Sequence, residues 1–200
     1  MKYYIIAGEA SGDLHASNLI REIRKLDTSA EFRCWGGDLM EKQGAIVVKH
    51  YRDLAFMGFL EVLANLRTIL GNLAYCKKDI LEYAPDAIIL VDYPGFNLRV
   101  AEFAHKRKIP VIYYISPQLW AWKQSRIKTI RSSVDKMIVI LPFEKEYYAR
   151  HGVEVEFSGH PLLDALAEKT VSPVLPENGK RRVALLPGSR QQEIRKVLPI

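Results

Sequence analysis

The chain has 200 residues, of which 48% are hydrophobic, so it is long enough to bury a core as one domain or as one domain plus part of another. It shows neither a secretory leader nor an apolar run long enough to span a bilayer, and we expect a cytoplasmic protein. The formal net charge of +6 favours an anionic partner, such as a nucleotide, a phosphorylated lipid or a membrane surface.

The chain begins with an apolar strand that runs into a glycine turn. Residues 3–7 are apolar, the turn reads Gly-Glu-Ala-Ser-Gly-Asp over residues 8–13, and apolar side chains then recur at helical spacing as far as Leu26. Such a turn directs backbone N–H groups and a helix dipole at phosphate or carboxylate oxygens above the strand. Its spacing fits neither a Rossmann nor a Walker loop, so a second interpretation stays open: Gly8 and Gly12 only permit a sharp reversal and close packing.

Strands and helices alternate beyond this turn. Further strands are predicted at residues 31–35, 45–48, 85–91, 109–115, 136–141 and 153–157, and helices at residues 98–106 and 142–151. This order is typical of an α/β protein with a Rossmann-like parallel sheet, helices on both faces and right-handed crossovers. Cys34 and Cys76 have no Cys-x-x-Cys spacing and no histidine cluster beside them, so we expect core thiols and no metal site.

Residues 57–75 are more apolar than a surface helix requires, and Glu61 and Arg67 are their only charged residues. Either they form a long core helix, or they form an interfacial helix that touches lipid or acyl chains. Glu61 lies alone on this apolar stretch, which favours a functional partner for it.

Asp92 follows the predicted strand at residues 85–91 and therefore lies at its carboxyl end. Ligands of open parallel sheets collect at that edge, which makes Asp92 a candidate acid or base. Alternatively, Asp92 or Asn97 caps the following helix, and Asn97 is the better placed of the two.

The strand at residues 109–115 leads to the same edge and to a loop with two tryptophans, Trp120 and Trp122. These side chains either plug the core or form the wall of a sugar or lipid pocket, with a basic flank from Lys123, Arg126, Lys128 and Arg131. The aromatics are not interleaved along successive strands, so we expect no nucleic-acid partner. His160 lies in a glycine-proline loop, where it is either structural or a ligand contact.

The C-terminal part has the pattern of a second sheet that has only begun. Residues 170–179 are rich in turn residues, residues 181–186 predict a strand, and a helix is predicted from Gln191. We therefore expect an N-terminal domain at residues 1–169, a linker at 170–179 and a truncated C-terminal domain at 180–200, in a natural chain that continues about as far again.

Seven motifs in order along the chain resemble the lipid-A-disaccharide synthases, glycosyltransferases of the two-domain GT-B architecture. The motifs are the turn at residues 8–13, Met57-Gly58 with Glu61-Val62, Asp92-x-Pro-x-Phe-Asn97, the loop at residues 116–123, the Leu-Pro-Phe-Glu of residues 141–144, Gly159-His160, and the Leu-Pro-Gly-Ser-Arg of residues 186–190. One departure is Gly95, where many relatives carry a second aspartate. The resemblance implies that this chain is the N-terminal acceptor-side domain and the start of the nucleotide-sugar domain.

The resemblance also implies an inverting hexosyl transfer without metal or cofactor. UDP-2,3-diacylglucosamine and 2,3-diacylglucosamine 1-phosphate would give the β-1,6 lipid A disaccharide and UDP. It makes Asp92 the candidate base and assigns the diphosphate to Gly188, Ser189 and Arg190. It assigns substrate contacts to Glu9, Ser11, Gly12, Met57, Glu61, Asn97, Gln118, Trp120 and His160.

For the whole protein, the resemblance implies peripheral contact with the inner membrane from the cytoplasmic side, and a homodimer formed through the C-terminal portion. We expect the 200-residue chain by itself to be inactive, because most of a GT-B nucleotide site lies in the second domain. The alternatives are an enzyme like the UDP-sugar epimerases and a non-catalytic fragment that binds an acylated phosphosugar.

Overall fold

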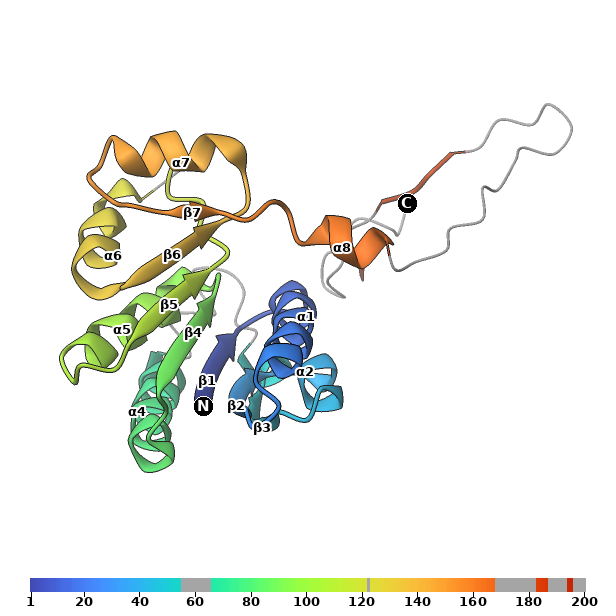
Figure 1. The fold of residues 1–200 in the computed structure, drawn as a ribbon, viewed down its shortest axis with the longest axis vertical. Coiled ribbons are helices and arrows are strands. Elements are labelled where there is room, and N and C mark those ends of the chain that lie inside the picture. The colour runs from blue at the N-terminus through green and yellow to red at the C-terminus, as the bar shows by residue number, and fades with distance from the viewer. Residues whose placement is uncertain (55–65, 122, 168–182, 187–193, 196–200) are drawn as a thin grey trace, which may run out of the picture. The chain divides into compact units, whose positions relative to one another are not determined.

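A sheet of seven parallel strands lies at the centre of the structure, which is a computed structural model that describes residues 1–54, 66–121, 123–167, 183–186 and 194–195 (Figure 1). The strand order is β3-β2-β1-β4-β5-β6-β7. The strands are β1 (Lys2–Ala7), β2 (Glu31–Gly36), β3 (Ile46–His50), β4 (Ala87–Val91), β5 (Val111–Tyr114), β6 (Lys136–Val139) and β7 (Glu156–Phe157). The predicted α/β class with a Rossmann-like parallel sheet is confirmed.

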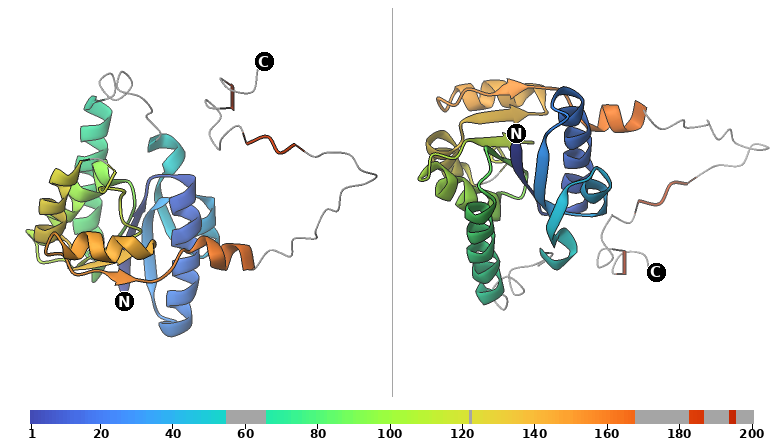
Figure 2. Two further views of the ribbon diagram at one scale, coloured as in Figure 1. Left: turned by 90° about the horizontal axis from the view of Figure 1, so that it is seen from above. Right: turned by 60° about the horizontal axis from the view of Figure 1, so that its bottom comes forward.

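Helices cover both faces of this sheet. The α-helices are α1 (Ala10–Leu26), α2 (Asp38–Lys42), α4 (Leu66–Tyr83), α5 (Pro94–His105), α6 (Ile127–Ser133), α7 (Pro142–Ala149) and α8 (Leu162–Ala167), and short 3-10 helices span Tyr51–Leu54 and Gln124–Arg126. Helices α1 and α2 pack on one face, and α4, α5, α6 and α7 pack on the other (Figures 1 and 2). None of the helices in the described part of the chain is long and apolar enough to cross a membrane.

The core consists of two apolar layers, one on each face of the sheet. Successive residues of β1 alternate between them, with Tyr4 in the layer under α4 and α5 and Ile5 in the layer under α1. Strand β4 is buried along its whole length, as its unbroken apolar sequence predicts for a central parallel strand. Cys34 and Cys76 are free, fully buried thiols, in agreement with the prediction.

Two local predictions are wrong. Helix α5 begins at Pro94 and not at Leu98, since proline supplies the backbone angle of a first helical turn. Residues 183–186 are exposed and form no strand, because no neighbouring strand pairs with them within the described ranges.

The chain divides into two compact units, Met1–Ala165 and Leu166–Ile200, and the sheet lies in the first. The predicted linker at residues 170–179 falls outside the described residues. The proposed limits of the linker and of the second domain therefore stay predictions.

Candidate functional site

The sheet changes its direction of winding between its two central strands, β1 and β4. From β1 the chain enters α1 on one face, and from β4 it enters α5 on the other. Loops at such a switch point diverge, and open α/β sheets bind ligands in the crevice outside the carboxyl ends of the strands. Glu9 belongs to the first loop, and Asp92 and Tyr93 belong to the second. The candidate site is therefore this edge of the sheet.

Asp92 and Tyr93 follow β4 in the left-handed region of backbone space. Their φ angles are 43° and 48°. Residues other than glycine lose roughly 1–3 kcal/mol in such conformations, which persist only where the surrounding structure holds them. Strain of this kind often accompanies functional sites.

The carboxyl of Asp92 has a raised pKa of about 6. Desolvation by the surrounding protein is the largest cause, the negative charge of Glu9 adds to it, and a hydrogen bond from the Tyr93 backbone opposes both. Part of the side chain stays exposed, and water that reaches it limits the shift. A carboxyl that titrates near neutral pH is suited to accept a proton from a substrate hydroxyl.

Asn97 lies inside the first turn of α5 and is fully buried, so the alternative in which it caps the helix is wrong. Its Nδ2 donates to the backbone carbonyls of Asp92 at 2.7 Å, Val91 at 3.3 Å and Ile6 at 3.4 Å. The amide therefore ties together the ends of β1 and β4. In this position Asn97 supports the site from below, and its predicted substrate contact stays a prediction.

The two glycines of the first turn allow close packing. A Cβ at Gly12 would stand 3.1 Å from the Cβ of Ala7, because α1 starts directly over the end of β1. A Cβ at Gly8 would stand 2.4 Å from Cγ of Tyr93. The space that Gly8 leaves open is thus occupied by a tyrosine of this chain. Glu9 and Ser11 are exposed beside it, whereas Gly12 is buried.

Asp13, the last residue of the same motif, is a buried structural carboxylate. Its oxygens accept hydrogen bonds from the backbone N–H groups of Gly37 at 2.8 Å, Leu39 at 3.1 Å and Met40 at 3.1 Å. These are the groups that the first turn of α2 leaves unpaired. Asp13 therefore stabilises α2 from a neighbouring helix, a role that its place in the turn motif does not reveal.

The loop after β5 borders the same edge of the sheet, and buried side chains hold it in place. The Ser116 hydroxyl bonds to the Tyr148 hydroxyl at 2.7 Å, and both side chains are buried, as is Leu119. Ile115, which leads into the loop, has a φ of 66°, an outlier for a β-branched residue. Gln118 is exposed on this loop.

Trp120 stands at the surface of this loop with 36% of its area exposed. Its ring contacts Phe143 edge to face, with 5.2 Å between the centroids and 85° between the planes. The tryptophan is therefore held on one side and open on the other, as the wall of a binding site would be. The prediction for Trp122 lies outside the described residues.

His160 is half-buried, and its Nδ1 accepts a hydrogen bond from the backbone N–H of Leu162 at 3.2 Å. His15, on α1, is buried near it, and the pKa of His15 is lowered by desolvation and by the charge of His160. His160 thus has a structural partner in the backbone of Leu162, and part of its side chain stays exposed to solvent.

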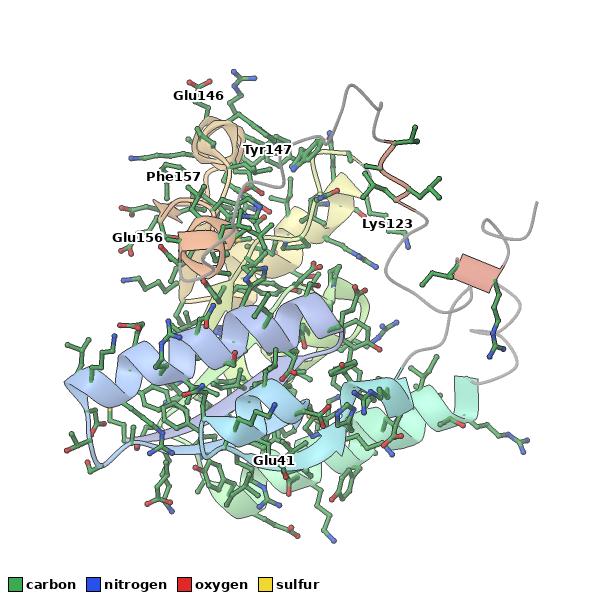
Figure 3. The ribbon with its side chains drawn as sticks, turned by 90° about the vertical axis from the view of Figure 1, so that its right-hand side faces the viewer. Glu41, Lys123, Glu146, Tyr147, Glu156 and Phe157 are labelled. Atoms are coloured by element: carbon green, nitrogen blue, oxygen red, sulfur yellow. The ribbon has the colours of Figure 1, made fainter. Side chains whose placement is uncertain are left out.

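The remaining predicted contacts, Met57, Glu61, Gly188, Ser189 and Arg190, lie outside the described residues. Lys123 of the basic flank is exposed beside the Trp120 loop, and Figure 3 shows it pointing away from α7. Within the described ranges, no three His, Cys, Asp or Glu side chains gather as metal ligands do.

An open hollow of about 460 Å³ lies elsewhere, beside the edge strand β7, and is lined by Lys145, Ala149 and residues 153–157. Glu156 and Phe157, which border it, are exposed at this side of the sheet, and Glu146 and Tyr147 extend from α7 beside them (Figure 3). The hollow lies two strands beyond β5 and away from Asp92. The switch point, with its raised carboxyl pKa, is the better candidate for chemistry.

The sequence identifies Asp92, Glu9 and the tryptophan loop, because each of them lies at a strand end or within a motif. It does not identify Tyr93 or Tyr113. Tyr113 is an apolar-looking strand residue whose hydroxyl reaches the Asp92 carbonyl at 2.6 Å. Its only sequence signal is a phenol hydroxyl within a predicted apolar strand, and the side chain itself is fully buried.

Comparison with known sequences matches residues 3–200 to the lipid-A-disaccharide synthetase family model. A lipid-A-disaccharide synthase of Syntrophus aciditrophicus is 45% identical over 201 residues, covering 98% of this chain and 52% of the relative. One of Trichlorobacter lovleyi is 41% identical over 200 residues, with the same coverage. The chain spans about half the length of these curated relatives.

Comparison with solved structures shows the same fold in more distant proteins. A UDP-GlcNAc 2-epimerase from Neisseria meningitidis bound to UDP-GlcNAc aligns with a TM-score of 0.60 at 14% identity, over 84% of this chain and 48% of that one. A putative UDP-N-acetylglucosamine 2-epimerase from Listeria monocytogenes aligns with a TM-score of 0.61 at 12% identity, over 86% and 49%. At such identities the likeness extends to the fold alone.

Proposed function

The chain belongs to the lipid-A-disaccharide synthetase family, and on that premise we propose a glycosyltransferase of lipid A biosynthesis. The proposal concerns the full-length protein, meaning this chain continued to the length of its relatives. Its donor is UDP-2,3-diacylglucosamine and its acceptor is 2,3-diacylglucosamine 1-phosphate. The products are the β-1,6-linked disaccharide and UDP.

The reaction inverts the anomeric carbon of the donor in one displacement. The 6-hydroxyl oxygen of the acceptor attacks that carbon, the bond from the carbon to the diphosphate oxygen breaks, and UDP leaves with the electron pair. The hydroxyl proton passes to the carboxylate of Asp92, which acts as general base.

The observation that supports this role is the position of Asp92 at the switch point with a pKa of about 6. A carboxylate of higher basicity takes a hydroxyl proton more readily, and at neutral pH this group is still mostly ionised. Glu9 contributes by keeping negative charge next to it. Asp92 is thus ionised and more basic than an ordinary aspartate at the pH of a cell.

The other proposed contacts follow the family motifs. Gly188, Ser189 and Arg190 stabilise the departing diphosphate without a metal ion, through backbone N–H groups and the guanidinium. Ser11 faces the same cleft from α1. Gln118, Trp120 and His160 contact the sugars, and Met57 and Glu61 belong to the apolar segment proposed to receive the acyl chains.

The acylated substrates also imply where the protein works. We place it on the cytoplasmic side of the inner membrane as a peripheral protein, since a net charge of +6 favours an anionic lipid surface. A homodimer of the full-length protein through its C-terminal portion completes the proposal.

The deciding measurement is UDP release by the full-length protein with the donor present and the acceptor either added or omitted. Acceptor-dependent release, with formation of the disaccharide, is the expected result. UDP release at the same rate with and without the acceptor would indicate an epimerase or hydrolase instead. Binding of the acylated phosphosugar without any release of UDP would indicate a binding protein.

A further inference from the structure

We infer that Tyr113 and Asn97 are positioning residues for Asp92, because their side chains hold its backbone carbonyl and thereby keep its carboxyl beside Glu9. This inference rests on the proposed function for its catalytic meaning. The hydrogen-bond geometry on which it depends is seen in the structure and is independent of that function.

Two buried side chains from different elements converge on one oxygen atom. The Tyr113 hydroxyl, from β5, donates to the Asp92 carbonyl at 2.6 Å, and the Asn97 amide, from α5, donates to it at 2.7 Å. Both side chains are fully buried. A carbonyl oxygen has two lone pairs, so these two bonds fill its acceptor capacity. Turning the carbonyl away would cost the buried Tyr113 hydroxyl its acceptor and would cost Asn97 the shortest of its three hydrogen bonds.

The peptide group held in this way is the one that joins the two left-handed residues. It follows Asp92 and precedes Tyr93, whose φ angles are 43° and 48°. Its orientation sets ψ of Asp92 and φ of Tyr93, so the two hydrogen bonds oppose relaxation to an ordinary backbone. The Tyr93 ring, packed against Gly8, resists the same relaxation from the other side.

The backbone conformation decides where the carboxyl lies. A left-handed residue sends its Cα–Cβ bond in a direction that an extended or helical residue at the same place would not. Released from the two donors, Asp92 would relax, and its carboxyl would move away from Glu9 and toward water. Tyr113 and Asn97 are fully buried, and they act through Asp92.

The side-chain amide of Asn97 acts here as a hydrogen-bond donor and not as an acceptor. Its Oδ1 is buried and finds no partner among the described residues, whereas its Nδ2 serves the Asp92, Val91 and Ile6 carbonyls. A residue kept only for packing would avoid that unpaired oxygen, because burying it costs free energy. The donor function therefore accounts for an amide at this place.

The test compares Tyr113→Phe, Tyr4→Phe and Asp92→Asn in the full-length protein. Tyr4 is the matched control, since it is fully buried and its hydroxyl donates to Asp79 at 2.7 Å, within the layer under α4. Each Tyr→Phe change removes one buried hydrogen bond and keeps the ring. The readouts are the Tm, kcat and KM for UDP release, and the titration of the Asp92 carboxyl by ¹³C NMR. The resonance is assigned by its loss in Asp92→Asn.

Tyr113→Phe is expected to lower kcat at least about tenfold with KM unchanged, because small misplacements of a catalytic group are costly. The Asp92 carboxyl is expected to titrate at lower pH than in the unaltered protein, since it becomes better hydrated. Tyr4→Phe is expected to lower the Tm comparably and to leave kcat and the titration alone.

If Tyr113→Phe behaves like Tyr4→Phe in both kcat and titration, the positioning inference is overturned while the proposed function stands. If Asp92→Asn keeps its activity, the base role fails instead. The NMR titration still decides in that case whether Tyr113 holds the carboxyl, because it does not depend on turnover.

Discussion

The ring of Tyr93 lies against the backbone of Gly8, so that a Cβ added at position 8 would stand 2.4 Å from Cγ of the tyrosine. Gly8 follows β1 and Tyr93 follows β4, so this contact joins the two loops of the switch point. The ring also stacks on Phe96, with 5.7 Å between the centroids. Gly8 is required here for space, because a side chain would enter a place that the ring already fills.

Gly8→Ala is therefore expected to destabilise the protein by about 1–3 kcal/mol, the usual cost of overpacking a buried site. Urea unfolding measures the effect. The matched control is Gly95→Ala, because a Cβ at position 95 meets no atom within 4 Å and the residue lies in α5. That change should leave stability unchanged or raise it by up to about 1 kcal/mol. Equal stability of the two variants would disprove the steric role of Gly8.

Asp92→Asn is expected to lower kcat of the full-length protein by about 100-fold or more, the scale of losing a general base. Circular dichroism should show an intact fold. In the unaltered protein, kcat/KM should fall about tenfold per pH unit below a pH of about 6, where the carboxyl becomes protonated. Glu82→Gln, an exposed change near the end of α4, is the control and should keep full activity. A pH profile that stays flat down to pH 5 would remove Asp92 from the mechanism.

The raised pKa of Asp92 also predicts a pH-dependent stability. A carboxyl whose pKa is higher in the folded state than in the unfolded chain favours folding at low pH, and this contribution is lost as the pH rises through about 6. Asp92→Asn should therefore be more stable than the unaltered protein at pH 7, by about 1 kcal/mol after allowance for solvent at the exposed carboxyl. The difference should shrink toward pH 4. A variant that is less stable at pH 7 would show that the carboxylate is needed for structure.

Asp13→Ala is expected to destabilise the protein by about 2–4 kcal/mol, because it leaves three backbone N–H groups at the start of α2 without their acceptor. Asp38→Ala is the comparison and should cost much less, since Asp38 is exposed and water screens its contacts with Arg52 and His50. Urea unfolding of both variants measures the difference. Losses of similar size would mean that Asp13 does not stabilise α2 as inferred.

Much of the fold could be predicted from the sequence, because its signals are local. Apolar β-branched runs such as that of β4 identify buried strands, and apolar residues at helical spacing identify α1. Alternation of these elements implies parallel strands with crossovers, which places Asp92 and the Trp120 loop at one edge. The seven motifs added the family, which the comparisons support over residues 3–200.

Element ends were predicted less well, because they depend on backbone geometry more than on hydrophobic pattern. Helix α5 starts at Pro94, which places Asn97 inside the helix where its amide reaches three strand-end carbonyls. Residues 183–186 have the composition of a strand, but a strand also needs a neighbour to accept its hydrogen bonds. Composition cannot supply that neighbour.

By itself, then, the sequence determined the α/β class, the family and the chain positions from which site residues come, since each follows from spacing within one element. Only the tertiary structure decided which of them act together. Tyr113 lies 21 residues from Asp92, and Asp13 lies 24 residues from Gly37. Contacts of this kind depend on how helices and strands pack against one another. The hydrophobic periodicity of a single helix or strand does not specify which elements lie next to it in the sheet.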